Sequence, residues 1–453
     1  MASLMGQKRA VLRVRRVMAH CHDSYFFAPC SQDAEKSLSG KALCLACLLI
    51  ALLQAASGAD RIRVLLVGQV TPEHCPAPMW FDAEPMVEYS LVPTKYYNVM
   101  TLAEAQRFVR LYLPRSREDM ATERFFMFIN PYFEPMTVVQ IDNMRYAMVE
   151  TGSGGFQSLG GITIDWAAVN WPWVQSALAP IFPNDPNAYN VWEQHKSTGN
   201  QPYKVEVNQD PALAPVLKMF ISLGIEEVRG YWTIVLIVPQ EGATVWGRAR
   251  GAYVQYSREP PVAWLLSWRY GKSMTWSVAD DLDCPWWGDT YYASDQEYGL
   301  DIMMNIILHS LGRKLPDDIM LVSTVRDDFE RYGARTSTIS AFLDFAESFG
   351  ADPRRIVEKK TQIDAVMNEA RQMYLDGLYQ DALDKSEEAH EGLEDLELMA
   401  IKLKDQALMW VYIIEWAAVT GTCMITGYVL YALMLKRRLY REVSVTRAST
   451  SET

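Results

Sequence analysis

Residues 61–67 read Arg-Ile-Arg-Val-Leu-Leu-Val, and residues 125–129 read Phe-Phe-Met-Phe-Ile. Runs this short and this apolar are typical of strands that are buried on both faces of a parallel sheet. An amphipathic segment at 102–113 follows the first run, and a helical segment at 135–150 follows the second. This alternation of strand and helix predicts an α/β fold, with a mostly parallel sheet and right-handed crossovers.

Further strands are predicted downstream at 203–207, 232–238, 252–256, 262–268 and 274–279. Because their connections are short, part of the sheet is expected to be antiparallel. A helix at 298–311 is expected to pack back on the sheet and to complete a domain that spans 60–313. A domain of roughly 250 residues buries enough surface to be stable without a disulfide or a metal.

The region that follows, 314–407, is predicted to be a helical stalk. Its segments 356–378 and 379–408 lack interior proline and are rich in Ala, Leu, Glu and Lys, with Gly377 near their junction. This composition favours a helical hairpin. Because no helix breaker separates 400–408 from the apolar residues after it, the last helix is expected to continue into them.

Residues 416–435 contain no charged side chain. A helix of about 20 residues spans about 30 Å, which is the thickness of the bilayer hydrocarbon. Lys436, Arg437 and Arg438 follow at once, so the positive-inside rule places the tail at 436–453 in the cytoplasm. The sequence therefore predicts one transmembrane helix within 408–435, in contact with membrane lipid, and a large domain outside the cytoplasm.

Residues 1–59 are predicted to be a signal region. Lys41 precedes an uncharged run at 42–56, and the small residues Ser57 and Ala59 follow it, which is the order of a secretory signal peptide. The run is shorter than the roughly 20 residues that a span needs, so cleavage after Ala59 is preferred over an uncleaved anchor. The residues before Lys41 suggest an overextended N-terminus.

Composition narrows the class of partner. The chain has 43 basic and 55 acidic residues, for a net charge of -12, which disfavours nucleic acid. Its hydrophobic content of 49% excludes a disordered chain. Cys75 and Cys284 are the cysteines expected to face an oxidising exterior, where they could form a disulfide. No cofactor is predicted.

Several segments resemble a known family. The stretches 61–67, 125–130 and 144–161, with Gly154-Gly-Phe and Gly160-Gly161 in the last, resemble the class I glutamine amidotransferase-like domain of exported and membrane-anchored prokaryotic proteins. Segments 261–264, 269–272 and 280–281 resemble the later half of that domain. The tail at 407–443 is similar to a chiefly archaeal family of single-span membrane proteins of unassigned function. The resemblance implies a flavodoxin-like sheet over 60–313.

The resemblance also implies where an active site would lie. Active amidotransferases of this superfamily use a cysteine in a glycine-flanked elbow, with a late histidine and an acidic residue. The corresponding loop here reads Thr151-Gly-Ser-Gly-Gly155, and His309 is followed by Ser310 and Leu311 rather than by a His-x-Glu pattern. Since a thiolate nucleophile needs a cysteine and a base, glutamine hydrolysis is not expected.

The candidate catalytic residue is Ser153, with His195 or His309 as its base. A sharp strand-to-helix turn would expose the hydroxyl of Ser153, although serine in a glycine loop is also ordinary turn chemistry. Four glycines near it are candidate ligand-binding positions that either cradle an anion or let two elements pack closely: Gly154, Gly155, Gly160 and Gly161.

Three carboxylates follow the predicted strand 274–279. Asp280, Asp281 and Asp283 could bind a hard cation such as Ca²⁺ through oxygen ligands, or they could be solvated strand-end acids. Five tryptophans of this region could stack on a sugar or pack in the core: Trp264, Trp268, Trp276, Trp286 and Trp287.

Two functional hypotheses follow. The first is a membrane-anchored exterior α/β domain that binds a protein or small-molecule ligand, or acts as a scaffold, without catalysis. The second is an exported hydrolase of an amide, ester or glycan, in which Ser153 or the Asp280 group participates. A hydrogen bond between Ser153 and a histidine in an open cleft would favour the hydrolase.

Overall fold

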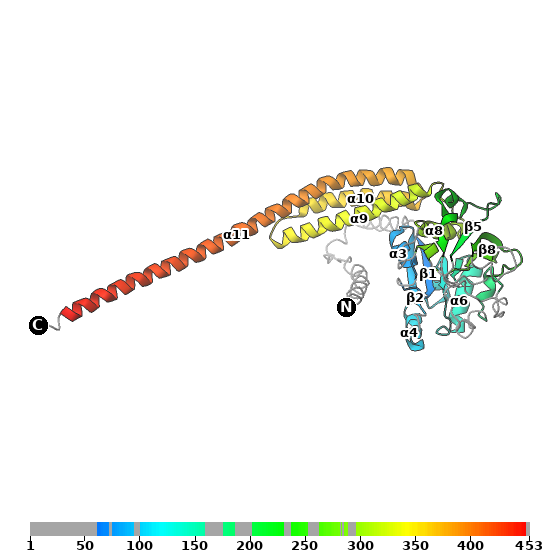
Figure 1. Ribbon diagram of the computed structural model, residues 1–453, viewed down its shortest axis with the longest axis horizontal. Helices are drawn as coiled ribbons and strands as arrows, with labels where there is room; N and C mark the ends of the chain where they lie inside the picture. Colours follow the sequence, from blue (N-terminus) through cyan, green and yellow to red (C-terminus); the bar gives the residue numbers. More distant parts are fainter. Residues whose placement is uncertain are drawn as a thin grey trace, which may run out of the picture. The chain divides into compact units, whose positions relative to one another are not determined.

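Nine strands of the described residues form one mixed sheet (Figure 1). The computed structural model describes residues 61–71, 75–94, 100–158, 175–185, 202–230, 237–251, 262–280, 282, 285–288 and 296–449. The predicted signal region therefore lies outside the described residues. The strands are β1 (Ile62–Gly68), β2 (Val87–Pro93), β3 (Phe125–Ile129), β4 (Gly154–Ser158), β5 (Tyr203–Val207), β6 (Arg229–Gly230), β7 (Thr244–Gly251), β8 (Val262–Tyr270) and β9 (Ser273–Val278).

The sheet is parallel at one end and antiparallel at the other. Its strand order is β2-β1-β3-β4-β9-β8-β7-β5-β6. The pairs from β2 through β9 are parallel, whereas those from β9 through β6 are antiparallel. The α/β class and the mixed character of the sheet are therefore confirmed. The predicted strand 252–256 and most of 232–238 lie outside the described residues.

Helices cover both faces of the parallel part. They are α3 (Ala77–Ala83), α4 (Leu102–Tyr112), α5 (Arg117–Met120), α6 (Val138–Val149) and α8 (Gly299–Ser310). Short 3-10 helices lie at η2 (Ala179–Ile181), η5 (Lys218–Leu223), η6 (Ile225–Glu227) and η8 (Pro285–Trp287). Thr101 and Thr137 begin α4 and α6 with capping boxes, in which each threonine side chain accepts the backbone N–H of the third helical residue.

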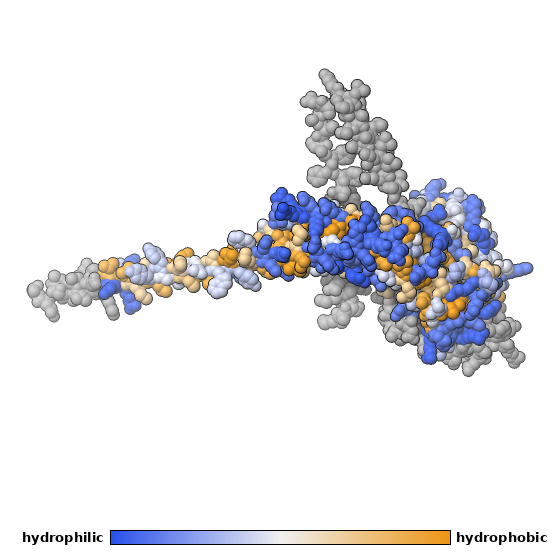
Figure 2. All heavy atoms as spheres, turned by 90° about the horizontal axis from the view of Figure 1, so that it is seen from above, coloured by the Kyte–Doolittle hydropathy of each residue, from blue (hydrophilic) through white to orange (hydrophobic). Residues whose placement is uncertain are grey.

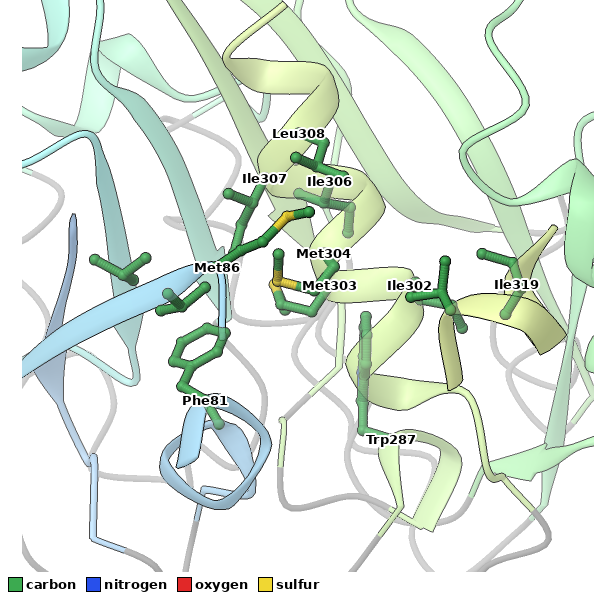
Figure 3. Packing of buried hydrophobic residues seen from close by; sticks show 14 of the residues in the cluster. Phe81, Met86, Trp287, Ile302, Met303, Met304, Ile306, Ile307, Leu308 and Ile319 are labelled. Atoms are coloured by element: carbon green, nitrogen blue, oxygen red, sulfur yellow. The ribbon is translucent and has the colours of Figure 1, made fainter. Parts of the chain in front are cut away.

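Alternating side chains of β1 enter two different apolar cores. Val64 and Leu66 belong to the core that includes α3 and α8, whereas Leu65 and Val67 belong to the core that includes α4 and α6. Figure 3 shows Met303 and Ile307 of α8 gathered with Met86 in the first core. A central strand buried on both faces is what the apolar run at 61–67 predicts.

Three long helices follow the α/β part. They are α9 (Ile319–Ser348), α10 (Arg354–Leu375) and α11 (Tyr379–Ser449), and α11 packs against both of the others (Figure 1). The hairpin of α10 and α11 was predicted. The 30-residue helix α9 lies within 314–407, which was predicted to be helical, although its bounds were not predicted. The last helix does continue without a break from the stalk into the apolar segment.

The helices α9 and α10 and the first part of α11 form a bundle. Beyond this bundle, α11 presents apolar side chains to its surroundings (Figure 2). Among the described residues it is the one helix long and apolar enough to cross a membrane. Large exposed side chains there include Trp416, Met424, Tyr428 and Leu433. A soluble protein would leave such a surface unfavourably hydrated, so the segment is compatible with a single-pass membrane protein.

A buried ion-pair network joins the α/β part to the bundle. Arg326 of α9 donates to Glu84 after α3 at 3.2 Å and to Asp301 of α8 at 2.6 Å. The Tyr374 hydroxyl of α10 and the Met86 backbone N–H also donate to the Glu84 carboxylate. Burial raises the pKa values of Glu84 and Asp301 even though Arg326 opposes this shift. Two carboxylates therefore share one buried cation at the joint.

Candidate binding site at the carboxyl ends of the parallel strands

Polar side chains gather where four neighbouring parallel strands end. Gln69 follows β1, Asn130 follows β3, Ser158 is the last residue of β4, and Asp280 comes shortly after β9. All four are buried. In open α/β sheets, ligands bind outside the carboxyl ends of the strands, where the strand order reverses direction. This edge is therefore the candidate site.

The backbone at the carboxyl ends of the neighbouring strands β1 and β3 has an unusual conformation. Gly68 has φ +122°, and a Cβ there would lie 2.0 Å from the carbonyl oxygen of Ile129, so the two strand ends approach too closely for a side chain. Asn130 has φ 42°, its backbone N–H donates to the Ser158 carbonyl at 3.0 Å, and its Nδ2 donates to Gln69 Oε1 at 3.4 Å. A positive φ is uncommon for residues other than glycine, although asparagine adopts it more readily than most.

Asp280 is held from two directions. The Tyr203 hydroxyl of β5 donates to its carboxylate, and Ser158 Oγ donates to its backbone carbonyl at 2.8 Å. Asp281 and Asp283, its predicted partners in cation binding, lie outside the described residues. Within the described ranges, no three His, Cys, Asp or Glu side chains gather as a metal site would require. The cation site at 280–283 stays a prediction.

A neutral network continues beside the strand ends. Gln157 Nε2 donates to Ser277 Oγ at 2.7 Å and also to Asn184 Oδ1, and Ser277 Oγ donates to the same Asn184 oxygen at 2.7 Å. Gln157 Oε1 is buried and has no hydrogen-bond partner among the described residues. Amides and hydroxyls of this kind bind polar groups through hydrogen bonds, and they supply no general base.

Ser153 lies at the opposite end of β4 from this site. The expected strand-to-helix turn is wrong, because α6 ends at Val149 and β4 begins at Gly154, so the turn leads from a helix into a strand. The buried Ser153 hydroxyl donates to the Glu123 carbonyl at 2.6 Å. Its own carbonyl accepts from Ser273 Oγ at 2.6 Å. These bonds fix Ser153 as a structural link between neighbouring elements.

His309, a predicted base, packs edge-on against two tryptophan rings. Its ring centroid lies 5.5 Å from that of Trp246 and 5.8 Å from that of Trp276. Burial, together with the Arg269 cation, lowers the pKa of His309. No hydrogen bond joins it to Ser153 in the part of the chain that the structure describes. His195, the other predicted base, lies outside that part.

The two described glycines of the predicted ligand loop are inside β4. A Cβ on Gly154 would lie 2.5 Å from a ring carbon of Phe125, and one on Gly155 would lie 2.3 Å from the terminal methyl of Met148. Both positions therefore allow neighbouring side chains to pack against the strand. Gly160 and Gly161 lie outside the described residues.

The remaining predicted residues are mostly buried. Cys75 is buried, and Cys284 lies outside the described residues, so their disulfide stays a prediction. Of the five tryptophans, only Trp268 is not fully buried, and its indole N–H donates to the Ile181 carbonyl at 2.6 Å. The buried rings include Trp264, Trp286 and Trp287, whose centroids lie 4.2 to 5.5 Å apart.

The site residues predicted from the sequence do not include Gln69, Asn130, Ser158 or Tyr203. The first two had a usable signal, since each is the first polar residue after a buried apolar strand. Tyr203 had none, because the Asp280 that it contacts is 77 residues later in the chain.

Comparison with known proteins adds little. No family profile matches the chain, and no curated protein is significantly similar to it. The cytoplasmic protein STM3548 from Salmonella typhimurium is 13% identical, with a TM-score of 0.36 over 55% of this chain and 98% of that protein. The cytoplasmic protein STM1381 from Salmonella typhimurium LT2 is 11% identical, with a TM-score of 0.37 over 55% of this chain and 99% of that protein. Similarity this low carries no inference about activity.

Proposed function

We propose that the protein is a single-span membrane protein whose exterior α/β domain binds a ligand or acts as a scaffold, without catalysis. The observation that carries this proposal is α11, one uninterrupted helix that packs against α9 and α10 and then continues into an apolar, exposed segment. A helix shared in this way attaches a folded domain firmly to a bilayer.

The orientation rests on charge. Lys436, Arg437 and Arg438 lie directly after the uncharged segment 416–435, and Glu415 lies directly before it. Basic residues are retained on the cytoplasmic side of a span, and this rule supports the proposal that the α/β domain is on the exterior of the cell membrane.

The proposal includes kinship with the class I glutamine amidotransferase-like domains. The parallel strands lie in the order β2-β1-β3-β4-β9, which corresponds to the 2-1-3-4-5 order of flavodoxin-like sheets. This order supports the flavodoxin-like assignment that the resemblance implies.

Binding is favoured over hydrolysis by the chemistry at the two ends of β4. At the carboxyl end, amide and hydroxyl groups of Gln69, Asn130 and Ser158 are preorganised for hydrogen bonds. At the amino end, the Ser153 hydroxyl is committed to a backbone carbonyl. The proposed ligand is therefore a polar molecule, or a polar segment of a protein, that reaches the carboxyl ends of the parallel strands.

Membrane topology is tested by labelling single cysteines with a membrane-impermeant maleimide in intact cells. A cysteine at Leu378, which is exposed between α10 and α11, is expected to react. A cysteine at Ser444 in the tail is expected to react only after the cells are permeabilised. Protection of the Leu378 position in intact cells would refute the proposed orientation.

Ligand binding is tested on the detergent-solubilised chain with a library of small polar molecules, read as a shift in melting temperature. A binder is expected to lose its shift in Asn130→Ala and to keep it in Ser153→Ala. Turnover of an ester or amide substrate that Ser153→Ala abolishes would instead establish the hydrolase.

A further inference from the structure

The α9 and α11 helices run side by side in the same direction. Asp328 accepts a hydrogen bond from Ser386, Arg335 donates to Glu397 at 2.7 and 2.8 Å, and Lys404 lies over the Phe342 ring at 4.5 Å. Each residue of α11 in these contacts is 58 to 62 residues later in the chain than its partner on α9. In the two contacts nearer the end of α9, those of Arg335 with Glu397 and of Phe342 with Lys404, the offset is 62 residues.

This register places the end of α9 relative to the apolar segment. Extended from the Phe342–Lys404 contact, it sets Phe349, the residue after α9, level with Val411 of α11. At the helical rise of 1.5 Å per residue, Phe349 lies about 7.5 Å before Trp416, where the uncharged run begins. The polar headgroup layer on each side of the hydrocarbon is roughly 5–8 Å thick. The connection between α9 and α10 thus reaches the depth of the headgroups.

The side chains at this level suit a membrane interface. Phe349 is 47% exposed, and its ring packs against Phe345 with centroids 4.9 Å apart. At the same level, α11 exposes 57% of Trp410 and 59% of Tyr412. Figure 2 shows apolar residues where the bundle ends and α11 continues. Aromatic rings of this kind concentrate at the boundary between lipid headgroups and acyl chains.

We infer that the α9–α10 connection rests on the exterior leaflet of the membrane, with Phe349 in the headgroup layer beside Trp410 and Tyr412. The partner is the polar–apolar interface of a phospholipid bilayer. The inference rests on the proposed function, because it requires α11 to cross the bilayer. It adds a second contact with lipid, which holds the bundle against the surface in addition to the single span.

The inference is tested with the full chain, carrying Cys423→Ala, in vesicles of phosphatidylcholine and phosphatidylglycerol. An environment-sensitive fluorophore is attached to Ser348→Cys, a variant that keeps Phe349. Lipids with a spin label on the headgroup serve as shallow quenchers. The same label at Leu378→Cys, exposed at the far end of the bundle, is the matched control. A label at Tyr428→Cys, within the span, is measured with lipids that carry the quencher on the acyl chain. The parent without an added cysteine gives the background.

Loss of emission at Ser348 with the shallow quencher, together with unchanged emission at Leu378, is the expected result. Phe349→Glu is expected to reduce that loss, because a carboxylate disfavours the interface. If Tyr428 is quenched while Ser348 is not, the contact with the leaflet is refuted and the span stands. If Tyr428 is not quenched either, the proposed span itself fails. The Ser348 label could instead shift its emission to the blue without being quenched by lipid. That result would mean that protein, such as a second copy of the chain, covers the α9–α10 connection, and it would overturn the inference.

Discussion

Replacing Arg326 with methionine should strongly destabilise the joint between the α/β domain and the bundle. Arg326, Glu84 and Asp301 have side chains that are only 7%, 1% and 4% exposed. Methionine keeps much of the arginine volume, so the substitution removes the buried cation with little loss of packing. The two carboxylates would then remain in a nonpolar environment without the charge that compensates them.

The two carboxylates should not suffer equally. Glu84 keeps the Tyr374 hydroxyl and the Met86 backbone N–H as donors, whereas Asp301 loses its ion pair at 2.6 Å. Removing one partner of a buried pair costs about 3–5 kcal/mol. We therefore expect Arg326→Met to lose about that much stability, and Arg326→Met with Asp301→Asn to recover much of it, since an amide carries no charge to bury.

Urea unfolding of the detergent-solubilised chain, followed by tryptophan fluorescence, measures both variants. The control is Arg250→Met, because Arg250 and Glu206 form an ion pair in which the side chains are 61% and 44% exposed, and such pairs contribute under about 1 kcal/mol. If Arg326→Met unfolds at the same urea concentration as Arg250→Met, the charge argument is refuted. If the asparagine variant restores nothing, the loss comes from packing instead.

Gly68, Tyr203 and His309 of the α/β domain give three further predictions. Gly68→Ala should cost more than about 2 kcal/mol, because a Cβ would meet the Ile129 carbonyl oxygen, and urea unfolding with a wild-type-like result would disprove the close approach. Tyr203→Phe removes the donor to the Asp280 carboxylate and should cost about 1–3 kcal/mol in the same titration, while no change would show that the bond contributes nothing. Burial lowers the pKa of His309 below 6.5, so the unfolded chain takes up this proton first and stability should fall as pH drops below 6.5. His309→Gln should remove up to about 1.4 kcal/mol per pH unit of that dependence, and an identical pH profile for both proteins would contradict the assignment.

The strands that matched the predictions are those whose residues have one plausible environment. The five apolar residues Phe125–Ile129 form β3 with the predicted bounds. The segment Gly154–Ser158 was instead interpreted as a glycine loop, although it forms β4. Its glycines are required because Phe125 and Met148 occupy the space beside the strand, and that requirement depends on residues distant in the chain.

The bounds of helix α9 were not predicted, for a related reason. Its middle contains Gly333, Thr336, Thr338 and Ser340, which are weak helix formers. The hydroxyls of the last three donate to carbonyls four residues earlier, and packing on α11 stabilises the helix. Tertiary contacts therefore override local preference here, and a single sequence does not display those contacts.

Only part of the candidate site was predictable from the sequence, at strand ends that follow an apolar run. Asn130 follows an apolar run and precedes Pro131, a pattern that indicates a turn at a strand end. Its nearness to Gln69 and Ser158 depends on the strand order, which follows from how the whole sheet assembles.

The length of α11 sets how far from the bilayer a partner must reach to bind the α/β domain. The part of α11 from Tyr379 to Glu415 measures about 55 Å along its axis at the helical rise. With this segment upright on the bilayer, the α/β domain is out of reach for a neighbour that projects only a short loop. A partner anchored in the same membrane must extend a similar distance from the bilayer to bind the α/β domain, whereas a freely diffusing partner need not.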